Sequence, residues 1–155
     1  MKIRRILVAG ALATSMSPFF AGHAGATNIG NEGCTPGYWK NHSDNWQEYT
    51  PGTTLGSLFT FPTGLAAMGN DSMLTALSYP GGPGVSGGAR ILMRASVAAF
   101  LNAAHEGVGY PLRRFSTPGE MQSAINTALA SNDRATMLEL ATYLDGLNNL
   151  GCPLN

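Results

Sequence analysis

The sequence offers few of the side chains that most often carry chemistry. Only 12% of its 155 residues are charged, and it contains two cysteines and three histidines. The cysteines, Cys34 and Cys152, lie far apart rather than in the C-x-x-C spacing of a redox centre. No H-E-x-x-H motif and no pair of histidines four residues apart is present. The common helical zinc signature is therefore excluded.

The sequence also lacks the patterns of a β-sheet, a repeat array and a membrane span. No stretch alternates apolar and polar residues for long enough to predict strands, and no period recurs along the chain. No apolar run reaches the roughly 20 residues that cross a bilayer. We therefore expect an all-α protein: a small disulfide-closed helical bundle with long ordered N-terminal loops and no membrane span in the mature chain.

Residues 1–26 have the three parts of a secretory signal peptide. The first five residues include three basic ones, and an apolar segment follows over residues 6–13. Ala24 and Ala26 then provide the small side chains that signal peptidase accepts at its cleavage site. Cleavage after Ala26 would leave residues 27–155 as a single helical secreted domain. A retained membrane anchor is the alternative, but the apolar segment is short for one. We expect the mature protein in the periplasm, outside the cell or at the cell surface.

Loss of this segment would change the charge balance. The mature chain would carry six Lys and Arg against nine Asp and Glu, a net charge of −3. A protein of that sign has no general attraction for nucleic acid or for an anionic membrane surface.

Export would place Cys34 and Cys152 in an oxidising compartment, where a disulfide between them is expected. Closing a loop of about 100 residues stabilises a domain by roughly 4–5 kcal/mol in the chain-entropy model. A free, reactive thiol pair is the alternative, although redox centres usually have C-x-x-C spacing.

Capping residues and apolar spacing predict the first helices. Thr35 followed by Pro36 begins a short helix, and Asp71 caps another. The Gly- and Pro-rich residues 80–88 are expected to form a flexible connector. Residues 89–105 carry apolar side chains on nearly every side, which predicts a helix in the middle of a bundle.

Two amphipathic helices are expected in the last third of the chain. Thr117 and Glu120 fit a capping box, with Thr117 at the N-cap and Glu120 at N3. Apolar residues then recur at helical spacing over residues 121–129 and again over residues 137–147. We expect these two helices to form a hairpin packed on the central helix.

Aromatic and polar side chains gather just after the first cysteine. Tyr38, Trp39 and Trp46 lie beside Lys40 and Asn41. Rings and hydrogen-bonding groups in this combination are typical of a site for a sugar or another ligand. The same tryptophans are also suited to packing against the bundle beside the disulfide. The segment is therefore either a ligand-binding surface or a structural anchor.

The mature chain holds two histidines, His42 and His105. With Asp44 or Glu106 they could form a three-ligand metal site. Each could equally be a hydrogen-bonded structural residue. No cofactor is expected from the sequence.

One short motif resembles a catalytic one. Residues 84–88 match G-x-S-x-G, in which a strand-to-helix turn exposes a nucleophilic serine. No strand is predicted before Ser86, and the chain is too short for that hydrolase fold. We therefore do not expect an esterase.

Residues 34–42 read C-T-P-G-Y-W-K-N-H. This segment resembles the C-T-P-G-[YF]-W-K-N-H opening of a module found in bacterial secreted and cell-surface proteins. The resemblance continues in residues 91–95 (I-L-M-R-A), 101–105 (L-N-A-A-H) and 147–154 (L-N-N-L-G-C-P-L), and so covers almost the whole mature chain. That family has no established activity, so the resemblance implies export and the extent of the domain.

These observations predict a non-enzymatic secreted domain for adhesion or recognition at the cell surface. Its partner would be a polysaccharide or protein of the cell surface or matrix, contacted by the residues around Tyr38, Trp39 and Trp46. One alternative is a small metal-dependent protein that uses His42 and His105. Another is a structural component of the envelope or matrix.

Overall fold

The computed structural model describes residues 30–115 and 120–154, so the predicted signal segment lies outside the described residues. All regular elements among these residues are helices, and two isolated bridges are the only strand-like pairings there. The all-α prediction is therefore confirmed, as is the disulfide between Cys34 and Cys152. Within the same residues, no helix has the length and apolar character needed to cross a membrane.

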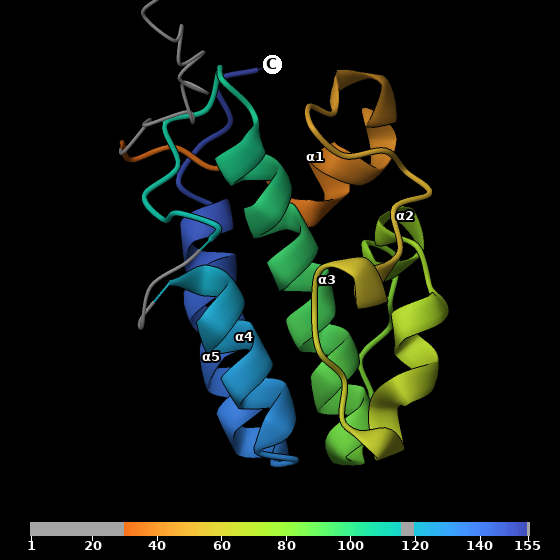
Figure 1. Ribbon diagram of the computed structural model, residues 1–155. Coiled ribbons are helices and arrows are strands. Elements are labelled where there is room, and N and C mark those ends of the chain that lie inside the picture. The colour runs from red at the N-terminus through yellow and green to blue at the C-terminus, as the bar shows by residue number, and fades with distance from the viewer. Residues whose placement is uncertain (1–29, 116–119, 155) are drawn as a thin grey trace, which may run out of the picture.

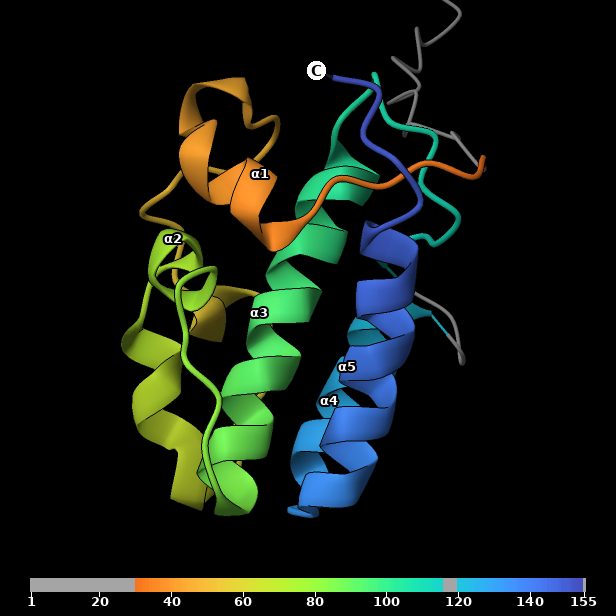
Figure 2. The ribbon, with the colours of Figure 1, turned by 180° about the vertical axis from the view of Figure 1, so that it is seen from behind.

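The central element is α3 (Gly84–Ala104), with helices on two sides of it (Figure 1). On one side lie α1 (Pro36–Asn41) and α2 (Met73–Ala76); on the other lie α4 (Met121–Ala130) and α5 (Arg134–Asn148), as the reverse view also shows (Figure 2). Fourteen of the 21 residues of α3 are buried, as expected for a helix with apolar side chains all round. Its main packing partner is α5.

The connection between α1 and α2 is a long loop with three short 3₁₀ helices, Ser43–Asn45, Leu55–Ser57 and Thr63–Asn70. Leu55, Phe59 and Leu65 point into the core from this loop and are almost completely buried. Burial of such side chains contributes about 1.5–3 kcal/mol each, so these residues fasten the loop to the core.

The N-cap of α2 is Ser72 rather than Asp71, so that prediction was wrong. The Ser72 hydroxyl accepts a hydrogen bond from the backbone N–H of Thr75 at 3.1 Å. The Asp71 carboxylate instead accepts from the hydroxyl of Tyr79. Serine and aspartate are both good N-cap residues. Here the Asp71 carboxylate binds Tyr79 instead, and Ser72 caps the helix.

Helix α3 begins at Gly84, so the prediction of a flexible connector was wrong for residues 84–88. A Cβ atom on Gly87 would lie 2.0 Å from the backbone oxygen of Gly82, and one on Gly88 would lie 2.9 Å from Cγ of Arg134. Glycine is needed here because two segments approach the helix closely. Its helix propensity is low, and the packing of this first turn overrides it.

The start of α4 also differs from the prediction. Thr117 lies outside the described residues, and Glu120 occupies the N-cap rather than position N3. Helix α5 begins after Asp133, whose carboxylate accepts hydrogen bonds from the backbone N–H and the hydroxyl of Thr136. These bonds lower the pKa of Asp133. A three-residue turn joins α4 to α5, which pack side by side as a hairpin (Figure 1).

Two glycine substitutions test the close approach at the start of α3. Gly87→Ala should lower the free energy of unfolding by about 1–3 kcal/mol, because its methyl group collides with backbone. Gly146→Ala, inside α5 with nothing within 4 Å of its Cβ, should be neutral or raise it by up to about 1 kcal/mol. Urea denaturation of both variants measures the difference. Equal effects of the two changes would contradict the close packing of Gly87.

Candidate functional site

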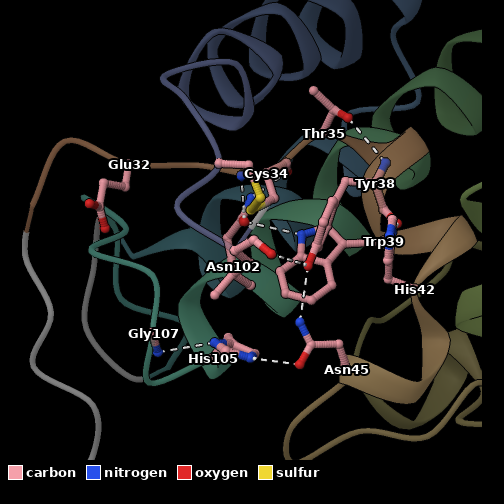
Figure 3. The surroundings of a disulfide bond; sticks show 12 residues. Glu32, Cys34, Thr35, Tyr38, Trp39, His42, Asn45, Asn102, His105 and Gly107 are labelled. Atoms are coloured by element: carbon pink, nitrogen blue, oxygen red, sulfur yellow. Dashed lines mark hydrogen bonds between the residues drawn. A yellow bond between two sulfur atoms is a disulfide. The ribbon is translucent and has the colours of Figure 1, made fainter.

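The segment that follows Cys34 is fixed by a buried amide, Asn102 of α3 (Figure 3). Its Oδ1 accepts hydrogen bonds from the backbone N–H of Cys34 at 2.7 Å and from Nε1 of Trp39 at 3.1 Å. Its Nδ2 donates to the Cys34 carbonyl at 2.8 Å and to Oδ1 of Asn148 at 3.0 Å. One side chain thus joins the disulfide segment, α1, α3 and α5.

Asn148 of α5 extends this network. Its Nδ2 donates to the backbone oxygen of Ala95 at 2.9 Å, and its Oδ1 also accepts from the hydroxyl of Tyr110 at 2.9 Å. Burial raises the pKa of Tyr110, so its hydroxyl keeps the proton that it donates. The amide groups of both asparagines are therefore paired in the interior, where an unpaired amide would be costly.

Trp39 is a structural residue, which corrects its prediction as a ligand-binding residue. Its side chain is 0% exposed, so no ligand can reach its ring in this structure. Its indole N–H is bound to Asn102, and its ring lies 5.8 Å from that of His105. The aromatic segment was expected to be either a ligand-binding surface or a structural anchor. Trp39 is a structural anchor.

The neighbouring residues face outward. Lys40, Asn41 and His42 are exposed, whereas Tyr38 and Trp46 are half-buried. The imidazole of His42 stacks on the ring of Tyr38, four residues earlier, with 4.2 Å between centroids and 14° between planes. We call these five residues the α1 surface. They include four of the five predicted ligand-binding residues, Trp39 being the exception.

The half-buried rings of the α1 surface are held in one orientation. The Tyr38 hydroxyl accepts from Nδ2 of Asn45 at 3.0 Å. Nε1 of Trp46 donates to the backbone oxygen of Trp39 at 2.9 Å. The Thr35 hydroxyl accepts from the backbone N–H of Tyr38 and caps α1, as predicted. Because the rings are already held in one orientation, they would lose little conformational entropy on binding a ligand.

A second anchor holds the end of this segment. Arg114 donates to both carboxylate oxygens of Glu48, at 2.6 and 2.9 Å, and to the hydroxyl of Tyr49 at 3.0 Å. Bidentate pairs of this kind fix orientation as well as distance. Glu48 has a φ of 63°, which non-glycine residues rarely adopt, and the pair with Arg114 holds it there.

The two histidines have different surroundings. His42 lies on the surface, whereas His105 is 7% exposed at the end of α3. Nδ1 of His105 accepts from the backbone N–H of Gly107 at 3.0 Å, so its Nε2 carries the proton toward Oδ1 of Asn45 at 3.4 Å. Burial lowers the pKa of His105, consistent with a neutral ring.

Across residues 30–115 and 120–154, no group of three His, Cys, Asp or Glu side chains is placed to hold a metal ion. The metal site at His42 and His105 stays a prediction. Ser86 of the G-x-S-x-G motif lies in the first turn of α3, and no strand leads into that helix. Its surroundings are therefore not those of a nucleophile elbow.

Sequence reasoning missed the residues that fix the surface. Asn102 is a lone amide within an apolar helix, and that contrast signals a buried hydrogen-bonding role. Asn148 and Arg114 give no comparable signal, because each stands beside a second residue of its own kind and does not contrast with its neighbours.

No family model, curated protein or solved structure matches this chain. The resemblance of residues 34–42 to bacterial surface modules therefore stays a prediction. Function has to be inferred from the side chains themselves.

Removal of the central amide tests the network. Asn102→Ala leaves the Trp39 indole N–H and the Cys34 backbone without their partners, so it should lower the free energy of unfolding by more than about 3 kcal/mol. The free energy of unfolding is measured in denaturant, with the disulfide oxidised in both the wild type and the variant. Asn41→Ala on the exposed surface is the matched control and should change stability by less than about 0.5 kcal/mol. A similar small effect of Asn102→Ala would contradict the role of the network.

The lowered pKa of His105 predicts that the stability of the protein depends on pH. Its pKa in the folded protein is below the ordinary 6.5, so the unfolded chain takes up the proton first as the pH falls. Its contribution to stability is complete above pH 6.5 and decreases below that value. Stability measured between pH 7.5 and 5 should therefore fall less in His105→Gln than in the wild type. Equal losses in the wild type and His105→Gln would show that His105 does not contribute.

Proposed function

We propose that this protein is exported and acts as a non-enzymatic recognition domain, which binds a polymer of the cell surface or matrix through the α1 surface. Two observations support export. Residues 1–26 have the composition of a signal peptide, and Cys34 and Cys152 form a disulfide, which persists in oxidising compartments. The resemblance of the opening motif to bacterial surface modules points the same way.

The observation that carries the proposal is the contrast across α1. Its inner face holds Trp39, completely buried and bonded to Asn102, while Lys40 and Asn41 on its outer face and His42 at its C-cap are exposed to solvent. The outer face combines an ammonium group, an amide and an imidazole ring stacked on Tyr38. Tyr38 covers one face of that imidazole, and the His42 side chain as a whole is exposed.

Such a surface is suited to a polar polymer. Its hydrogen-bonding groups can pair with hydroxyl or carboxylate groups, and the imidazole ring of His42 offers a flat surface against which a sugar ring can pack. Because the backbone beneath it is fixed by the disulfide and by Asn102, binding costs little conformational entropy.

The test is binding of the secreted, oxidised protein to an array of immobilised neutral and anionic polysaccharides. We expect saturable binding to at least one of them, weakened about fivefold or more in His42→Ala and in Lys40→Ala. Ser86→Ala, exposed at the opposite end of α3, is the matched control and should bind as the wild type does. Circular dichroism shows that each variant is folded.

Two results would contradict the proposal. One is the absence of saturable binding to any member of the array by a folded, oxidised sample, which would favour a structural component of the envelope. The other is binding that His42→Ala and Lys40→Ala leave unchanged, which would move the contact away from the α1 surface.

A further inference from the structure

Residues of α4 and α5 line a groove of about 490 Å³. These two helices lie on the side of α3 away from α1 (Figures 1 and 2). Ala124 and Ala128 line it from α4, and Leu140 lines it from α5. The two alanines are one turn apart on the same face of α4. Because both side chains are small, they leave a hollow between the helices. Its size falls within the range of about 300–1,000 Å³ of small-molecule sites.

One wall of the groove carries an exposed aromatic ring. Tyr143 of α5 is 54% exposed, more than Phe115 at 44% or Leu150 at 37%. Large apolar side chains are usually buried, and an exposed ring beside a hollow is an informative exception. A tyrosine in this place offers a flat apolar face together with a hydroxyl group.

The charge of the groove lining favours ligands that carry a positive charge. Glu139 is the charged residue that lines it, and α4 contains no charged residue. A lining with one carboxylate and no cationic side chain attracts cations and repels anions.

Hydroxyl groups complete the lining. Ser123 and Thr127 of α4 border the groove, one turn apart, across from Tyr143. Each hydroxyl can donate and accept hydrogen bonds. A bare aliphatic amine would leave these groups unused, whereas a sugar ring presents hydroxyls at its edge and an apolar C–H face.

We propose that the α4–α5 groove binds an oligosaccharide that carries free amino groups. Tyr143 packs against the face of a sugar ring, the hydroxyls of Ser123 and Thr127 pair with sugar hydroxyls, and Glu139 accepts from the ammonium group. The site is separate from the α1 surface, since α3 lies between them, and it stands independently of the function proposed above.

The experiment compares two tetrasaccharides by isothermal titration with the secreted, oxidised protein. One is a tetramer of glucosamine, with free amino groups, and the other is the matched tetramer of N-acetylglucosamine, which is uncharged. We expect saturable one-to-one binding of the glucosamine tetramer. The acetylated tetramer should bind up to about fivefold more weakly, as expected for loss of one exposed ion pair.

Variants assign the binding to the groove. Glu139→Gln should remove the preference for the free amine, and Tyr143→Ala should weaken both tetramers by about tenfold. Asp145→Asn, another exposed carboxylate of α5 that is not in the groove lining, is the matched control and should change neither. His42→Ala should also bind normally, so failure of the α1 proposal and failure of this one are distinguishable.

The proposal is overturned by any of three results with folded protein. These are no saturable binding of the glucosamine tetramer, equal binding of the two tetramers by the wild type, or a preference for the amine that persists in Glu139→Gln.

Discussion

Asn102 lies where α3, α5 and the disulfide segment meet, and its amide makes four hydrogen bonds there. An amide in an apolar interior is costly unless its groups are paired, and here each partner is itself a group that needs pairing. Asn148 and Tyr110 extend the same network. A buried network of this kind permits only one arrangement of the segments that it joins, whereas apolar contacts alone would tolerate several.

The exposed surface depends on that arrangement. The disulfide ties Cys34 to Cys152, but by itself it sets no orientation for α1. The bond from Asn102 to the Trp39 indole does so. Helical spacing then turns Lys40 and Asn41 outward, and His42, the C-cap residue, is exposed at the end of the helix. The other side of α3 is built differently, since small residues of α4 leave a groove rather than a fixed polar face. If both proposed surfaces bind, the domain could hold a polymer at two separated points, which would raise its avidity.

Local sequence signals predicted the helices better than their ends. The apolar character of residues 89–105 correctly placed a helix in the centre, and the disulfide that was expected from a predicted signal peptide is present. Gly87 and Gly88 indicated a loop, but both lie in the first turns of α3, where they pack closely against Gly82 and Arg134. Trp39 and His42 look alike in sequence as candidates for a contact surface. Only the tertiary position of Asn102 shows that one is buried and the other exposed, and no local pattern contains that information.

Native-state hydrogen exchange at Trp39 tests the role of Asn102 most directly. If the network fixes α1, the indole N–H of Trp39 and the backbone N–H of Cys34 exchange only through global unfolding. Their opening free energies should then equal the free energy of unfolding measured in denaturant, as for the central amides of α3. Opening free energies several kcal/mol lower than those of α3 would show that α1 detaches on its own. In that case the surface that it carries would not be held in place by the buried amides.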